Sequence, residues 1–166
     1  MTREFLGNSF FYSSVLLSQL LIFNHLNIFG YVSPFIYLII FIHYKTSYNK
    51  TILIFLGFIT GLIIDLSLQT YGCHTFATIT ICYLRNRIEK YSFGVNSNLP
   101  NAMIKGTKLI NRFMFFGIII VIHSLIYFSL IFFNIEILGS IIFNTLVNSI
   151  VTFIMIWLIS QLISNK

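Results

Sequence analysis

Residues 51–69 read TILIFLGFITGLIIDLSLQ, an unbroken apolar run with a single charged side chain, Asp65. Because an α-helix rises 1.5 Å per residue, about 20 apolar residues cross the ~30 Å hydrocarbon core of a bilayer. This stretch therefore predicts a transmembrane helix, and it predicts a membrane setting for the chain on either side of it.

The composition extends that prediction to the whole chain. Its 166 residues are 57% hydrophobic and 8% charged, with a mean hydropathy of +0.91, whereas soluble domains carry about 25% charged residues. We expect one all-α integral membrane domain over residues 1–166. The net charge of +6 is distributed between apolar runs, so it indicates contact with anionic lipid headgroups and excludes a folded basic face for nucleic acid.

Apolar runs and chain breakers together predict a bundle of six transmembrane helices. The candidate spans lie at about 9–29, 32–44, 51–69, 72–88, 112–133 and 139–163. The second and fourth are short for a full crossing.

The distribution of basic residues predicts the orientation of the bundle. If the N-terminus is cytoplasmic and all six segments cross, all ten basic residues fall on one side, as the positive-inside rule requires. The external connections then carry one charge, Glu136. The alternative has four spans with both short segments re-entrant, and it moves Lys45 and Lys50 outside. We predict six spans with both termini in the cytoplasm.

The one long connection, about 86–111, lies on the cytoplasmic side in this topology. Basic residues in and beside it are candidates for docking a cytoplasmic partner or anionic lipid, while the simpler interpretation is a solvated loop that only fixes topology. The candidates are Arg85, Arg87, Lys90, Lys105 and Lys108.

Asp65 is the residue that most needs a partner, since a carboxylate at membrane depth costs roughly 2.5–3.5 kcal/mol on insertion scales. Gly57 and Gly61 precede it at intervals of four, so all three share one helix face, and the glycines allow another helix to approach closely. We predict an interhelical seam there. If Asp65 only packs, its replacement by asparagine is expected to be nearly neutral.

In the six-span topology, Asp65 lies in the external leaflet at the level of His74, and the last span displays Asn144 and Asn148 on one face. Three interpretations are open. These residues satisfy one another and lock the helices together, or they line a small-molecule or ion site open to the outside, or they bind a metal. Metal binding has the least support, because no His-x-x-x-His or similar ligand spacing is present.

No set of residues predicts catalysis. The chain has four acidic residues in all, no glycine-rich phosphate loop and no plausible nucleophile with a base and an orienting group. Cys73 and Cys82 lie about 13 Å apart along one predicted helix, too far for a disulfide. We expect no enzyme activity, no metal and no cofactor.

The stretch from Gly57 through Asp65, followed by Tyr71, Gly72 and His74 and by a helix that ends at Arg85, resembles the central signature of the MreD family. That signature is glycine-leucine-x-x-aspartate, a short polar turn, glycine and often histidine, then a helix ending in arginine. The first span closes with NIFGYVSP at 27–34, similar to MreD proteins of Bacteroidota-like bacteria.

This resemblance implies a non-catalytic scaffold of the rod complex, or elongasome, in the bacterial cell inner membrane. There it implies support of cell shape and lateral peptidoglycan synthesis beside MreC, RodA and its partner transpeptidase, with MreB as an indirect partner. The predicted architecture also resembles the six-helix substrate-binding components of energy-coupling-factor transporters, so a vitamin-binding membrane component is the alternative. The first span lacks the alanine-rich motif that such components use to contact their coupling subunit.

Overall fold

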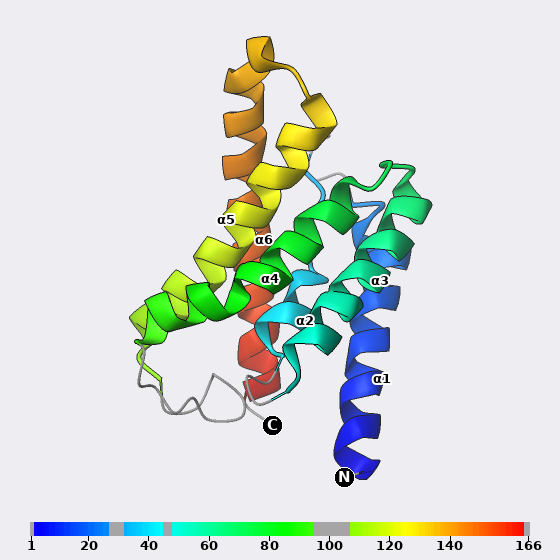
Figure 1. Cartoon of the computed structure of the whole chain (residues 1–166), viewed down its shortest axis with the longest axis vertical. Helices are drawn as coiled ribbons and strands as arrows, with labels where there is room; N and C mark the ends of the chain where they lie inside the picture. The colour runs from blue at the N-terminus through cyan, green and yellow to red at the C-terminus, as the bar shows by residue number, and fades with distance from the viewer. Residues whose placement is uncertain (1, 27–31, 45–47, 95–106, 165–166) are drawn as a thin grey trace.

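The computed structural model describes residues 2–26, 32–44, 48–94 and 107–164, with the side chains of 2–6, 135 and 164 excepted (Figure 1). Helices are the regular elements of this part of the chain. In order they are α1 (Thr2–Ser18), the π-helical turn η1 (Gln19–Phe23), α2 (Leu38–Ile42), α3 (Lys50–Leu68), α4 (Cys73–Phe93), α5 (Leu109–Phe132), the 3-10 turn η2 (Ile135–Ile137) and α6 (Leu138–Ser164).

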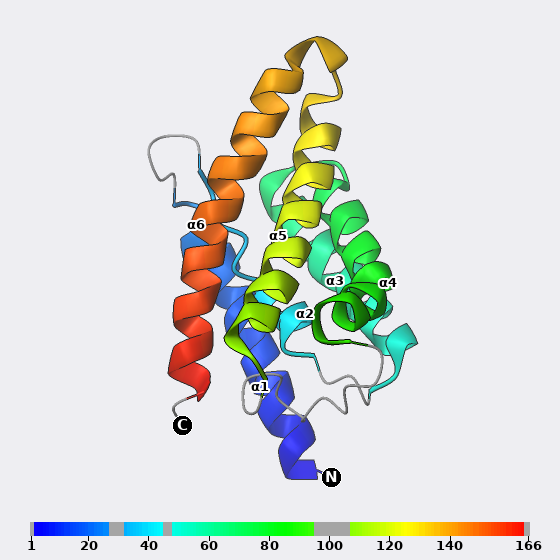
Figure 2. The ribbon, with the colours of Figure 1, turned by 90° about the vertical axis from the view of Figure 1, so that its left-hand side faces the viewer.

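The long helices alternate in direction along the bundle. In Figure 1, α1, α3 and α5 run away from the end that holds both chain termini, and α4 and α6 run back toward it. Helix α4 packs between α3 and α5, and α6 packs along α5. Figure 2 shows the α5–α6 hairpin reaching beyond the α3–α4 turn at the end opposite the termini.

Within the described residues, three helices are long and apolar enough to cross a membrane: α3, α5 and residues 138–163 of α6. They coincide within a few residues with the predicted spans 51–69, 112–133 and 139–163, and the all-helical class is confirmed. The fourth predicted span, 72–88, corresponds to α4, which extends five residues further, to Phe93. The helix ends there because Gly94 takes a φ of +90°. Apolarity marked only the first part of that helix, since its last turns carry charged residues.

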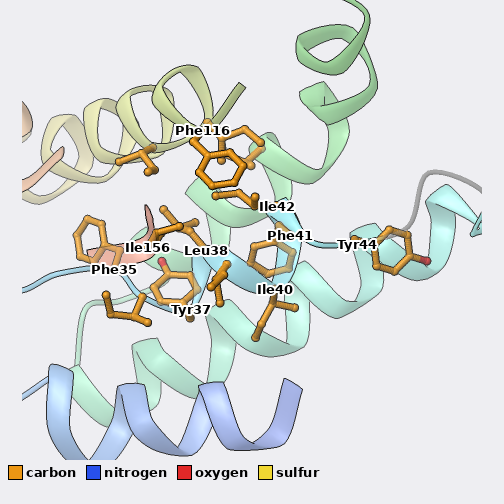
Figure 3. Close-up of a cluster of buried hydrophobic side chains, with 14 of the residues drawn as sticks. Phe35, Tyr37, Leu38, Ile40, Phe41, Ile42, Tyr44, Phe116 and Ile156 are labelled. Atoms are coloured by element: carbon orange, nitrogen blue, oxygen red, sulfur yellow. The ribbon is translucent and has the colours of Figure 1, made fainter. Parts of the chain in front are cut away.

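The predicted helical span over 32–44 is corrected by the structure. Only α2, five residues long, is helical in this segment, and each of its side chains is at most 2% exposed. Figure 3 shows these side chains filling the space between the surrounding helices. Pro34 has no N–H and restricts the residue before it, which fits the non-helical backbone at the start of the segment. Residues 32–44 therefore form the core segment of the bundle, in which every side chain except those of Ser33 and His43 is buried.

Non-helical backbone at membrane depth needs hydrogen-bond partners from the protein, and Gln19 supplies two of them. Its Oε1 accepts from the N–H of Tyr37 at 3.1 Å, and its Nε2 donates to the carbonyl of Pro34 at 3.2 Å. Thr152 on α6 accepts from the N–H of Phe35 at 3.1 Å. Gln19 lies in the π-helical turn that follows α1, 1% exposed. The first helix thus ends at Phe23 in a turn that holds the core segment in place.

The glycine face of α3 meets α4. A Cβ added at Gly61 would lie 2.5 Å from the Cα of Thr75 and 2.5 Å from Oγ1 of Thr78, and one at Gly57 would lie 2.7 Å from Sγ of Cys82. At Gly61 the obstacle includes backbone, whereas at Gly57 it is a side chain. The close approach expected from the spacing of these glycines is therefore made by α4.

We expect Gly61→Ala to destabilise the protein by about 1–3 kcal/mol, because α4 must shift to admit the methyl group. Gly117→Ala is the matched control, since nothing lies within 4 Å of a Cβ at that helical position; it should be neutral or slightly stabilising. Unfolding in mixed detergent micelles, followed by helical circular dichroism, measures both. Equal stabilities for the two variants would contradict the close α3–α4 contact.

Candidate functional site

Asp65 lies in the last turns of α3, with its carboxylate at the start of α4. Its Oδ1 accepts from the N–H of His74 at 3.0 Å, and its Oδ2 accepts from the N–H of Thr75 at 2.8 Å and from the Thr75 hydroxyl at 2.6 Å. The residue before α4, Gly72, has no side chain to cap the helix. Asp65 therefore performs, from the preceding helix, the work of an N-cap side chain, and its charge lies at the favourable end of the α4 dipole.

The same carboxylate also fixes the turn between the two helices. The hydroxyl of Thr70 donates to Oδ1, and the N–H of Thr70 donates to the Asp65 carbonyl at 3.2 Å. The turn takes left-handed backbone conformations at Gln69, Tyr71 and Gly72, with φ of 56°, 51° and 92°. Glycine adopts such a φ without steric cost, whereas the other two residues carry a Cβ that makes it unfavourable. The aspartate, the turn and Gly72 thus form one unit.

His74 faces the centre of the bundle and has a partner that the sequence did not indicate. The hydroxyl of Tyr37 lies 3.0 Å from Nδ1 of His74 and 2.7 Å from Nε2 of His123 on α5. All three side chains are at most 1% exposed. The ring of Phe35 packs edge-on against both imidazoles, at centroid distances of 5.3 Å and 5.1 Å. The core segment is thereby joined to α4 and α5.

A single hydroxyl proton serves this pair of hydrogen bonds. Tyr37 donates to one imidazole and accepts from the N–H of the other, so two neutral histidines carry their protons on the same ring nitrogen, either both on Nε2 or both on Nδ1. The outer ring nitrogens, Nε2 of His74 and Nδ1 of His123, are buried and have no partner among the described residues. The arrangement is a polar link between three elements within an apolar core.

The asparagines of α6 do not complete the predicted polar layer. Asn144 donates to the carbonyl of Ser140 on its own helix at 2.8 Å. Asn148 is 2% exposed, and its amide nitrogen and oxygen have no partner in the described part of the chain. The expected contact between Asp65 and His74 is present, through the N–H of His74, but the expectation that the asparagines join it is corrected. Asp65 uses backbone N–H groups and threonines, and His74 uses Tyr37.

Arg85 is another buried charged residue, and it caps the C-terminal end of α2, whereas Asp65 caps the N-terminal end of α4. Its guanidinium donates to the carbonyls of Phe41, Ile42 and Tyr44 at 2.7, 3.5 and 2.5 Å, and to Oε2 of Glu89 at 2.8 Å. The side chain is 1% exposed. Carbonyls at the C-terminal end of α2 have no partners within that helix, so Arg85 supplies them.

This geometry corrects the assignment of Arg85 as a docking residue, because its donors are used inside the protein. Arg87, Lys90 and Lys108 are exposed, as docking would require. Lys105 and the rest of residues 95–106 of the predicted cytoplasmic loop lie outside the described residues. The basic surface that remains available is thus smaller than the sequence indicated.

The described residues contain no group of three or more His, Cys, Asp or Glu that could hold a metal ion. An open cleft of about 330 Å³ lies beside Asp65 and is lined also by Leu62, Leu66, Gln69 and Tyr71. Its volume falls in the lower range of small-molecule sites. The carboxylate oxygens at its edge already accept hydrogen bonds from the chain, which leaves a ligand little to bind there.

Comparisons with protein-family models, curated proteins and solved structures give no match to this chain. Similarity to MreD therefore stays a prediction carried by the residues quoted above.

The site residues hold the fold together. Asp65 joins α3 to α4, Arg85 joins α4 to α2, and Tyr37 joins α2 to α4 and α5 through the two histidines. The polar groups in these contacts form hydrogen bonds within the protein. The arrangement fixes a bundle around its central segment, and it offers no assembled nucleophile and base among the described residues.

Proposed function

We propose that this protein is a non-catalytic scaffold of the MreD type, which supports the rod complex in the bacterial inner membrane. The observation that carries the proposal is the filled centre of the bundle. Every side chain of α2 is buried, and Phe35 and Tyr37 are 3% and 0% exposed. A transport component needs a cavity at the centre of its helices, whereas a scaffold needs a rigid body with its outer surface free.

The buried charges favour the same function. A carboxylate or guanidinium that served a substrate or a proton path would keep donors or acceptors free within the membrane. Here Asp65 accepts from backbone and hydroxyl groups, and Arg85 donates to three carbonyls and Glu89. Rigid positioning of helices is what both residues achieve, and a partner complex would then assemble on the exposed helix faces.

We further propose six crossings, with both termini in the cytoplasm. The shared end of the two termini, the alternating helix directions in Figure 1 and the segregation of all ten basic residues support this topology. In this topology the core segment, residues 32–44, crosses the membrane although it is mostly non-helical.

Reporter fusions test this topology. Fusions at Lys50 and Lys166 should give a cytoplasmic signal, because these positions lie beside basic residues, and fusions at Tyr71 and Asn134 should give an external one. A cytoplasmic signal at Tyr71 would exclude the six-span arrangement.

Depletion of the protein in its native host is expected to give rounded, widened cells, since lateral wall synthesis would lose its scaffold. Vitamin uptake should remain at the level of undepleted cells, which is the control. Cell width from phase-contrast images and uptake of labelled vitamins measure the two outcomes. Normal cell shape together with defective uptake would instead support the alternative, a substrate-binding component of an energy-coupling-factor transporter with its site at the cleft beside Asp65.

A further inference from the structure

Two exposed cations meet over one tyrosine ring at the end of the bundle that holds both termini. Lys50 is the first residue of α3, and its Nζ lies 4.9 Å from the ring centroid of Tyr83. Arg87, one turn further along α4, has its Cζ 5.8 Å from the same centroid. Two helices thus bring two positive charges close to the ring of Tyr83.

No carboxylate of the described residues balances this pair. Glu89 is buried with Arg85, Asp65 caps α4 at the other end of the helix, and Glu136 lies in the turn before α6. The side chain of the fourth acid, Glu4, is outside the described part. Both exposed cations lie near one ring centroid, at 4.9 and 5.8 Å, and their charges together favour an anion beside this ring.

The depth of the pair identifies the kind of anion. Lys50 is the first residue of a helix long and apolar enough to cross the membrane, so it lies where hydrocarbon gives way to headgroups. Tyr83 is 52% exposed beside it, in the manner of aromatic residues at membrane interfaces. At this depth the abundant anion is the phosphodiester of a lipid.

We propose that Lys50, Tyr83 and Arg87 form a binding site for the headgroup of an anionic phospholipid. The tyrosine ring holds both cations by cation–π contacts, and the lipid phosphate accepts hydrogen bonds from the ammonium and the guanidinium. The site differs from a diffuse basic surface because one charge comes from the first residue of α3 and the other from α4, the helix packed against it. It goes beyond the scaffold function and stands whether or not that function is correct.

The test uses the full-length protein in neutral detergent micelles, titrated with short-chain phosphatidylglycerol and followed by native mass spectrometry. We expect saturable binding of phosphatidylglycerol and none of phosphatidylcholine. The double variant Lys50→Gln/Arg87→Gln should bind roughly 10- to 30-fold more weakly, as the loss of two interfacial cations implies. Lys90→Gln/Lys108→Gln removes two exposed cations elsewhere on the protein and should change affinity less than about 3-fold.

The ring is tested separately. Tyr83→Leu should weaken binding roughly 2- to 5-fold because the cations lose their platform, and Tyr83→Phe should retain it. Equal weakening by the two double variants would overturn the proposal in favour of unspecific charge attraction. Displacement of the lipid by an equal concentration of inorganic phosphate would overturn it in favour of a site for free phosphate. Helicity measured by circular dichroism, which these exposed substitutions should leave unchanged, verifies that each variant is folded.

Discussion

Replacement of Arg85 by leucine is expected to lower the free energy of unfolding by about 3–5 kcal/mol, the usual effect of removing one partner of a buried ion pair. The variant leaves the Glu89 carboxylate, 4% exposed, without this guanidinium. It also leaves the carbonyls of Phe41, Ile42 and Tyr44 without their Arg85 donors. Because α2 is only five residues long, it cannot satisfy its own C-terminal carbonyls, and the core segment should loosen.

Three further variants separate the causes of this loss. Arg85→Lys keeps the charge but not the planar fork, so it should fall between wild type and Arg85→Leu. Arg85→Leu/Glu89→Leu also removes the carboxylate that binds Arg85 and should be less destabilised than the sum of the single changes. Lys90→Gln, exposed on the same helix, is the control and should be nearly neutral. Unfolding in mixed micelles and abundance in membranes are the measurements; a stable, abundant Arg85→Leu protein would contradict the capping role.

The helices that the sequence predicted well are those in which apolarity and length act together. Residues 51–69, 112–133 and 139–163 are predominantly apolar, and their length and composition are enough to identify them as transmembrane helices. The spacing of Gly57, Gly61 and Asp65 also predicted a seam, because residues four apart share a helix face. The structure places α4 at that seam.

Hydropathy could not predict the state of residues 32–44. An apolar segment buried in protein has the same composition as one that faces lipid, so its enclosure depends on the helices around it. Pro34 was the local sign that a regular helix was in doubt. The partners of its backbone, Gln19 and Thr152, lie far away in the sequence, and no spacing rule connects them.

The partners of Asp65 and Arg85 were difficult to predict for a related reason. Arg85 fits the positive-inside pattern, and only the fold shows that its partners are carbonyls more than forty residues earlier. The sequence indicated that Asp65 needs a partner, but its carboxylate oxygens accept from backbone N–H groups. Every residue except proline has such a group, so the sequence does not show which ones are used. A glycine before the predicted start of a helix, as at Gly72, was the one available signal that the helix needed a cap from elsewhere.

Substitutions at Asp65 should distinguish a capping role from a ligand-binding one, with Asp65→Leu losing about 2–4 kcal/mol of stability. Leucine leaves the N–H groups of His74 and Thr75 without their acceptors inside the membrane, and each unsatisfied donor costs roughly 1–3 kcal/mol. It also removes the anchor of the α3–α4 turn at Thr70. Abundance in the membrane and complementation of cell shape should fall together.

Asparagine at position 65 is a sharper test, because the geometry changes the expectation drawn from the sequence. Both carboxylate oxygens accept hydrogen bonds, whereas an asparagine offers one acceptor and places an amide NH₂ against a backbone donor. As a single-oxygen cap it should still retain part of the stabilisation, so a loss of about 1 kcal/mol is expected. The protein should remain in the membrane and complement cell shape, while Glu136→Gln, at an exposed carboxylate in the turn before α6, should match wild type in every measurement. An Asp65→Asn protein with wild-type abundance and stability but no complementation would show that the charge itself is used, and the capping role would then not explain why this position carries an aspartate.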